Sequence, residues 1–242
     1  MFNLNEGLFS YLFPNGATEG EYYLWFILSA ITVIVAGYLL GSVNSAIIIS
    51  KLLYRDDIRR HGSGNAGMTN MLRTYGKGAA GLTLFGDVFK TALAIFISGI
   101  VFGFNYVAGV STGMGFCYVA GLFAVLGHVF PIYYGFKGGK GVLVTSAMAL
   151  MLTPLPFLVL FLLFACIVAA SRYVSLGSIC VAILYPVLLH GYFAVAFGSP
   201  MPGLLSLSVV IIAVLIVWCH RANIERISNR TENKISFGKK KD

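Results

Sequence analysis

The sequence predicts an all-α protein: a polytopic membrane helix bundle. Three observations lead to this fold class. Hydrophobic residues make up 58% of the 242 residues, charged residues make up only 11%, and the mean hydropathy is +0.84. This composition excludes an ordinary soluble fold, and it excludes intrinsic disorder, which requires few apolar and many charged residues. We therefore expect a single integral membrane domain over residues 1–242, with no separate soluble domain.

Six apolar runs are long enough to cross a bilayer, which requires about 20 residues of helix. They occupy residues 22–49, 79–104, 113–131, 142–171, 174–197 and 203–219. The chain has no Lys or Arg before Lys51, whereas the segment from Arg221 to Lys241 is basic. The positive-inside rule then predicts that the N-terminus lies outside and the C-terminus in the cytoplasm. Termini on opposite sides require an odd number of spans, so one run must contain two helices.

The run to divide is 142–171, because it contains Thr153-Pro154-Leu155-Pro156. Two prolines remove two backbone donors and disfavour helix in the residues before them. Division here predicts seven transmembrane helices, keeps Arg172 inside, and leaves the outer segments 105–112 and 198–202 without Lys or Arg. The segment 142–152 is short for a full crossing, so a kinked or partly embedded segment is the alternative.

Three polar segments then face the cytoplasm, at residues 50–78, 127–141 and 220–242. The first two are rich in glycine, which lets backbone N–H groups converge on an anion, and a following helix N-terminus adds partial positive charge. Cations and neutral donors accompany them: Arg59, Lys137, Lys140, Ser42, Ser63, Asn65, Thr69 and Asn70. We interpret this as a phosphate site. The alternative is that turn glycines and inside-positive charge produce such loops in any polytopic protein.

The remaining titratable residues suggest structural roles. Asp87 and Lys90 lie three residues apart in an apolar span, so we expect a structural ion pair. His190 also lies in an apolar span and is interpreted as hydrogen-bonded within the bundle. The cysteines are interpreted as small buried hydrophobic residues: Cys117, Cys166, Cys180 and Cys219. Known P-loop spacing is absent, and the scattered acids do not form a metal site, so no metal or cofactor is expected.

Three motifs share an order and a composition that carry a family resemblance. The first is G-S-V at 41–43 with D-I-R-R-H-G-S-G-N-A-G-M-T-N at 57–70. The second is G-H-V-F-P-I-Y-Y-G-F-K-G-G-K-G-V at 127–142, and the third is H-R-A-N-I-E-R-I at 220–227 followed by T-E-N-K at 231–234. With these motifs the chain resembles the bacterial membrane-integral acyl-phosphate:glycerol-3-phosphate acyltransferases.

The resemblance implies a seven-helix monomer in the bacterial plasma (inner) membrane, with its active site on the cytoplasmic face. It implies transfer of a fatty acyl group from acyl-phosphate to the 1-hydroxyl of glycerol 3-phosphate, giving lysophosphatidic acid and inorganic phosphate as the first step of phospholipid synthesis. Glycerol 3-phosphate, acyl-phosphate and membrane lipid are the expected partners. No nucleic acid, metal or cofactor is expected.

The resemblance also implies roles for individual residues. Ser42, Arg59 and Lys140 would hold substrate phosphate, and the glycines Gly138, Gly139 and Gly141 would form a phosphate loop. Other implied site residues would bind substrate or shape the site: Ser63, Asn65, Thr69, Asn70 and His128. His220 and Asn223 would lie on the acyl-phosphate side, and Glu232 is also an implied site residue. Three positions depart from the family pattern: Asn44 replaces a common Pro, Ala222 a common Glu, and Arg230 a common Gly.

The chemistry suits this set of residues. An acyl-phosphate is an activated mixed anhydride, so positioning and stabilisation of the leaving phosphate suffice without a covalent nucleophile. Our hypothesis is that substrate phosphate assists deprotonation of the acceptor hydroxyl, with Ser42 and His220 as helpers. Two alternatives remain. A transporter or channel would need polar residues that reach the outer face, and a CDP-alcohol phosphotransferase would need several Asp residues on one helix.

Overall fold

A computed structural model describes residues 7–8, 18–103 and 112–235, and all regular structure within these ranges is helical. The prediction of an all-α protein is therefore confirmed. The long helices are α2 (Glu19–Ser42), α5 (Lys77–Phe102), α6 (Thr112–Val129), α8 (Pro154–Ser171), α9 (Val174–Phe197) and α10 (Gly203–Cys219). The short elements are α3 (Ser45–Tyr54), η1 (Ile58–Arg60), α4 (Met68–Tyr75), η3 (Ile132–Tyr134), α7 (Val142–Leu152) and α11 (Arg221–Ser228).

The predicted division of residues 142–171 is confirmed, because α7 ends at Leu152 and Pro154 begins α8. Among the described residues, five segments are long and apolar enough to span a membrane, and a sixth is obtained when α10 and α11, bent by 52°, count as one. The protein is thus a multi-pass membrane protein. The count of seven crossings and the side on which each terminus lies stay predictions. The tail from 236 and nearly all of the predicted outer segment 105–112 lie outside the described residues.

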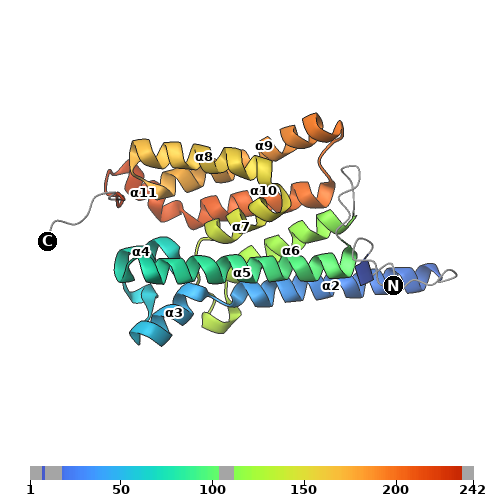
Figure 1. The fold of residues 1–242 in the computed structure, drawn as a ribbon, viewed down its shortest axis with the longest axis horizontal. Helices are drawn as coiled ribbons and strands as arrows, with labels where there is room; N and C mark the ends of the chain where they lie inside the picture. Colours follow the sequence, from blue (N-terminus) through green and yellow to red (C-terminus); the bar gives the residue numbers. More distant parts are fainter. Residues whose placement is uncertain (1–6, 9–17, 104–111, 236–242) are drawn as a thin grey trace.

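Helix α6 lies at the centre of the bundle and contacts α2, α5, α7 and α10. Helices α8, α9 and α10 form a second group on the other side of α7, which contacts both α5 and α8 (Figure 1). The core between the groups is tightly packed and contains buried side chains from α6, α7 and α9, including Tyr118, Met148 and Phe193. Residues of α4, α5, α8, α9 and α10 line a cavity beside α7.

Close contact between α2 and α6 brings two of the predicted motifs together. A Cβ atom on Gly41 would overlap the backbone of Ala124, and one on Gly127 would overlap the backbone of Tyr38 and Ser42. Small residues permit such close approach of helix backbones, which favours packing in a membrane. The C-terminal end of α2 therefore lies directly beside the end of α6.

The structure confirms the ion pair between Asp87 and Lys90 on α5, with 2.9 Å between Asp87 Oδ1 and Lys90 Nζ. It contradicts two interpretations of burial. His190 on α9 and Cys166 on α8 are exposed at the outside of the bundle, although Cys117 is buried as predicted. The physical reason is that a membrane helix is apolar on its lipid-facing side as well as its inner side, so hydropathy does not distinguish the two.

We predict that Gly41→Leu weakens the packing of α2 against α6 and destabilises the protein by about 1–3 kcal/mol, the usual range for overpacking. Thermal unfolding in detergent measures the effect. The matched control is Gly191→Leu on α9, where the described residues leave open space around the glycine. Equal unfolding midpoints for the two variants would contradict the close-contact interpretation.

Candidate active site

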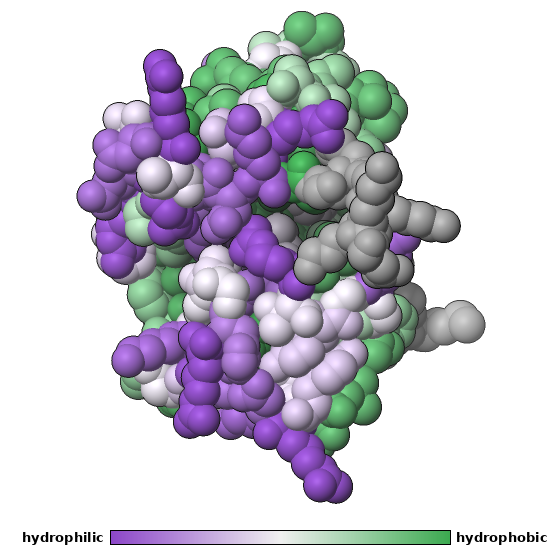
Figure 2. All heavy atoms as spheres, turned by 90° about the vertical axis from the view of Figure 1, so that its left-hand side faces the viewer, coloured by the Kyte–Doolittle hydropathy of each residue, from purple (hydrophilic) through white to green (hydrophobic). Residues whose placement is uncertain are grey.

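A cavity of about 850 Å³ lies at the end of the bundle that carries α4 and α11. Hydrophilic residues cover much of this end of the molecule, and hydrophobic residues appear around its rim (Figure 2). The polar lining comes from α4, the loop before α7, and the segment that follows α10. The apolar lining comes from α5, α7, α8, α9 and α10 and includes Leu143, Phe157, Leu160, Phe164 and Ile212. The cavity therefore has one polar and one apolar part.

Two helices begin at the polar part of this cavity. The N-cap residue of α4 is Gly67 and that of α7 is Gly141, and no described side chain caps either helix. The first residues of both helices line the cavity. The first N–H groups of a helix have no partner within the helix and carry partial positive charge, so they favour an anion.

Lys140 adds a formal positive charge and is tied to the third motif. Its Nζ donates a hydrogen bond to Asn223 Oδ1. Asn223 Nδ2 donates to Glu232 Oε1 at 2.7 Å, and the same oxygen accepts a hydrogen bond from Ser175 Oγ at 2.9 Å. The other carboxylate oxygen, Oε2, accepts from Arg226 Nε at 2.7 Å. Glu232 thus fixes Asn223 and, through it, the end of Lys140.

Burial lowers the pKa of Lys140 to about 8, although the nearby carboxylate of Glu232 works in the opposite direction. Burial also raises the pKa of Glu232, but hydrogen bonds from Arg226, Asn223 and Ser175 outweigh it and hold that pKa below its usual value. At neutral pH Glu232 is therefore ionised and Lys140 is a cation that loses its proton at mildly alkaline pH.

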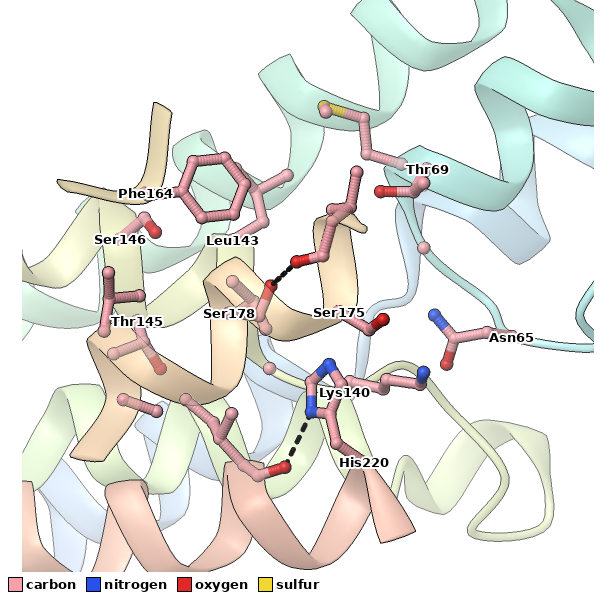
Figure 3. Close-up of a pocket in the computed structure, with 18 of the residues that line it drawn as sticks. Asn65, Thr69, Lys140, Leu143, Thr145, Ser146, Phe164, Ser175, Ser178 and His220 are labelled. Atoms are coloured by element: carbon pink, nitrogen blue, oxygen red, sulfur yellow. Dashed lines mark hydrogen bonds between the residues drawn. The ribbon is translucent and has the colours of Figure 1, made fainter. Parts of the chain in front are cut away.

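His220 lies between α10 and α11 and is buried. Its Nδ1 lies 2.7 Å from the backbone oxygen of Ile216. Because a carbonyl oxygen only accepts hydrogen bonds, Nδ1 carries the proton, and Nε2 of the neutral ring is left as an acceptor. Figure 3 shows His220 and Lys140 facing the same space as Asn65 and Ser175.

Asn70 holds the loop before α4 in its observed shape. Its buried side chain donates from Nδ2 to the backbone oxygens of His61 at 2.9 Å and Asn65 at 3.1 Å, and its Oδ1 accepts from the N–H of Ser63 at 3.0 Å. Ser63, Asn65, Thr69 and Asn70 all line the cavity, and their contacts to substrate stay a prediction.

Asn44, one of the departures from the family pattern, is the N-cap of α3. Its Oδ1 accepts from the N–H of Ile47 at 3.0 Å, and its Nδ2 donates to the backbone oxygen of Ala66 at 3.3 Å. A side-chain N-cap of this kind stabilises the first turn of a helix. The residue therefore begins α3 and connects it to the loop that precedes α4.

The N–H groups of the predicted phosphate loop are partly used within the loop itself, and the role of the loop in phosphate binding stays a prediction. The N–H of Gly138 donates to the backbone oxygen of Val129 at 3.1 Å, and the N–H of Gly139 donates to that of His128 at 3.0 Å. These two N–H groups are therefore used to close the loop, and neither glycine is among the described residues that line the cavity. Lys140 and Gly141 do line it. The part of the loop that faces the cavity is thus shorter than the sequence suggested.

Arg59 and Ser42, which the resemblance implies at the substrate phosphate, make hydrogen bonds within the protein. Arg59 Nε and Nη2 donate to the Asp57 carboxylate at 2.9 and 2.7 Å, and Nη1 donates to the backbone oxygens of Tyr134 at 2.9 Å and Lys137 at 3.3 Å. Ser42 Oγ donates to the backbone oxygen of Tyr38 at 2.8 Å. Neither residue is among the described residues that line the cavity. The geometry supports a role for Arg59 in holding the 134–137 segment.

The Arg59–Asp57 pair is ionised at neutral pH, because the hydrogen bond from Arg59 lowers the pKa of Asp57 to about 2. Direct phosphate contact by Ser42 and Arg59 stays a prediction. The nearest acidic partner of Arg59 is only two residues away in the sequence, so a local ion pair competes with any substrate.

Sequence analysis missed several polar residues of the cavity, among them Arg73, Ser175, Ser178 and Lys234. Arg73 follows Thr69 by four residues, which places both on one face of α4, so helical periodicity contained the signal. Ser175 and Ser178 begin an apolar run, where hydropathy hides small polar residues.

The apolar spans define an integral membrane protein. Its cavity has a cationic end that leads into an apolar interior, which suits an amphipathic anion. Comparison with known proteins then gives the family. The profile described as glycerol-3-phosphate acyltransferase matches residues 31–230, and the chain belongs to this family. This confirms the family resemblance drawn from the three motifs.

Relatives and solved structures agree with this assignment. The glycerol-3-phosphate acyltransferase of Syntrophomonas wolfei is 41% identical over 204 residues, covering 84% of this chain and 95% of the relative. That of Halalkalibacterium halodurans is 40% identical over 210 residues, covering 86% and 96%. The crystal structure of PlsY (YgiH), an integral membrane glycerol 3-phosphate acyltransferase, in its glycerol 3-phosphate form is 33% identical with a TM-score of 0.73. Its lysophosphatidic acid form has a TM-score of 0.71 at 32% identity, and each comparison covers 86% of this chain and 96% of the other.

Arg230, where the family pattern commonly has Gly, adopts a left-handed backbone conformation with φ of 56°. Side chains other than glycine are strained in this region, so we predict that Arg230→Gly stabilises the protein by up to about 1 kcal/mol. Thermal unfolding in detergent measures it, with Arg230→Ala as the control that removes the side chain but keeps the strain. A midpoint for Arg230→Gly at or below that of Arg230→Ala would contradict the prediction.

Proposed function

We propose that this protein transfers an acyl group from acyl-phosphate to the 1-hydroxyl of glycerol 3-phosphate, releasing lysophosphatidic acid and inorganic phosphate. One observation carries the proposal: two uncapped helix N-termini and Lys140 meet at the polar end of a cavity whose other part is apolar. Both substrates bear phosphate and one bears a fatty chain, so this division of the cavity suits them. The similar PlsY structures in glycerol 3-phosphate and lysophosphatidic acid forms support the same reaction.

In this proposal the polar end binds the phosphate groups and the apolar part holds the acyl chain. Lys140 supplies charge, and the first turns of α4 and α7 supply backbone N–H groups. Asn223 keeps Lys140 in position and lines the cavity, where it would contact the acyl-phosphate. The apolar side chains from α5, α7, α8 and α10 exclude water from the acyl chain, which strengthens the electrostatic interactions at the polar end.

The chemical step needs no covalent acyl-enzyme. The oxygen of the acceptor hydroxyl attacks the acyl carbon, the bond between that carbon and the phosphate oxygen breaks, and the leaving phosphate keeps the electron pair. The hydroxyl proton passes to a substrate phosphate oxygen, and Nε2 of His220 is placed as a further acceptor at the cavity. Of the two helpers in the sequence hypothesis, His220 lines the cavity and Ser42 does not, so we retain only His220 in this role.

The proposed setting is the bacterial plasma (inner) membrane, with seven crossings, the N-terminus outside and the cavity open toward the cytoplasm. The inside-positive charge pattern supports this orientation, because Arg59, Lys137 and Lys140 lie at the cavity end of the bundle. We propose a monomeric single domain, residues 1–242, that contacts membrane lipid and binds no nucleic acid. No metal or cofactor is required, because acyl-phosphate is already activated.

The direct test is release of inorganic phosphate by the purified protein in detergent. We expect release that depends on both acyl-phosphate and glycerol 3-phosphate, that persists with a chelator, and that falls about 100-fold or more in Lys140→Gln. The control Lys137→Gln changes an exposed lysine of the same loop that is not among the described residues lining the cavity, so it should retain activity. Transport of anions without release of inorganic phosphate would favour a transporter. Loss of activity with a chelator would favour a metal-dependent phosphotransferase.

We also predict an alkaline limit to activity. Only protonated Lys140 attracts phosphate, and burial lowers its pKa to about 8, so kcat/KM should fall as pH rises through about 8. Lys140→Arg keeps its charge at all accessible pH values, so its profile should lack this fall even where its overall rate is lower. A fall near pH 8 that persists in Lys140→Arg would assign it to another group.

A further inference from the structure

Lys90 on α5 takes no part in the proposed reaction, yet it is buried among acceptor atoms. Its Nζ lies 2.9 Å from Asp87 Oδ1, 3.1 Å from the backbone oxygen of Gly41, 2.8 Å from that of Val43 and 3.0 Å from His128 Nδ1. Its side chain is only 5% exposed. An ammonium group has three N–H bonds, so these four acceptors saturate it.

These contacts join segments that are distant in sequence. The oxygens of Gly41 and Val43 belong to the end of α2, where the chain breaks before α3 and helix carbonyls lose their helical partners. A cation at this end satisfies them and interacts favourably with the helix dipole. Asp87 Oδ1 also accepts a hydrogen bond from Ser45 Oγ at 2.9 Å, which connects the first turn of α3 to the same group.

His128 contacts both Lys90 and the loop that contains Lys140. Its Nδ1 faces Lys90, so the neutral ring has its proton on Nε2 when the ammonium donates to Nδ1. The backbone oxygen of His128 accepts from the N–H of Gly139, and a Cβ on Gly139 would overlap the imidazole ring. The loop therefore rests against the His128 ring and is bonded to its backbone immediately before Lys140.

A contribution to stability alone does not explain why the Asp87–Lys90 ion pair is buried. Removing two charges from water costs several kcal/mol per ion, so a buried ion pair contributes little net stability compared with apolar residues of the same size. The pair lies where the end of α2, the start of α3 and the end of α6 meet, and it connects to each of them by a hydrogen bond.

We propose that Lys90 is a positioning residue: held by Asp87, it fixes the end of α2 and the ring of His128, and thereby sets the place of the loop that carries Lys140 at the phosphate site. The inference rests on the proposed function. It assigns to the Asp87–Lys90 pair a role in phosphate binding that the ion pair by itself does not require.

The test is the double variant Asp87→Asn/Lys90→Gln, which removes both charges together so that neither is left buried and unpaired. The Thr83→Val variant on the same helix is the control, because Thr83 is buried and its hydroxyl bonds only to the Ala79 backbone oxygen among the described contacts. The single variant Asp87→Asn is the comparison that leaves the Lys90 contacts to the backbone and His128.

Inorganic phosphate, as a competitive inhibitor of the acyl transfer, is the probe. We expect its inhibition constant, and the KM values of the substrates, to rise about 10- to 100-fold in the double variant, less in Asp87→Asn, and not at all in Thr83→Val. A purely structural role would reduce the folded fraction and so lower kcat, without any change in the inhibition constant.

An unchanged inhibition constant in the folded double variant, or equal changes in the double variant and Thr83→Val, would overturn the inference. Where the double variant does not fold, Ser45→Ala gives a milder form of the same test, since it removes a hydrogen bond to Asp87 and changes no residue that lines the cavity. Absence of turnover in the wild-type protein would instead refute the proposed function, and phosphate binding by calorimetry on the same variants would then decide the role of Lys90 on its own.

Discussion

The structure of the site depends on which groups accept hydrogen bonds from the first backbone N–H groups of two helices, because these N–H groups have no partner within their helix. Helices α4 and α7 begin after Gly67 and Gly141, which offer no capping side chain, and both open on the same cavity. The first N–H groups of each helix have no helical partner, so an anion bound at this point, as we propose, would accept hydrogen bonds from them. The neighbouring loops, shaped by Asn70 and closed by Gly138 and Gly139, precede the two helices whose first residues line this cavity.

At the same end of the bundle, hydrogen bonds join the charged side chains around Lys140 to polar partners. Lys140 is bonded to Asn223, Asn223 to Glu232, and Glu232 to Arg226 and Ser175. A cation held in this way costs little to reorganise when an anion arrives, which is the basis of electrostatic preorganisation. The apolar part of the cavity has a different task, because it accommodates a chain through burial and not through directed bonds. The two parts together suit one cavity to both substrates of the proposed reaction, which combine a phosphate with a fatty chain.

Much of the fold and of the candidate site could be predicted from the sequence. The parts that could not be predicted have identifiable physical causes. Long apolar runs and the prolines at 154 and 156 predict the helices and the break after Leu152, since these are local properties. The family resemblance implied Lys140, Asn223 and Glu232 as site residues, but it did not imply the hydrogen bonds that join them. The partners of Arg59 and the use of the Gly138 and Gly139 N–H groups depend on how loops approach each other, which composition does not reveal. The outward position of His190 was missed because lipid-facing and core-facing surfaces are both apolar.

The central claim is that an anion occupies the space between the first turns of α4 and α7 beside Lys140. Crystals of the protein grown with arsenate, a phosphate analogue whose arsenic atom is located by anomalous scattering, test it directly. The account predicts an anomalous peak within hydrogen-bond distance of Lys140 Nζ and of backbone N–H groups at the start of both helices. Anomalous peaks confined to other places on the molecule, with this space holding none, would contradict it.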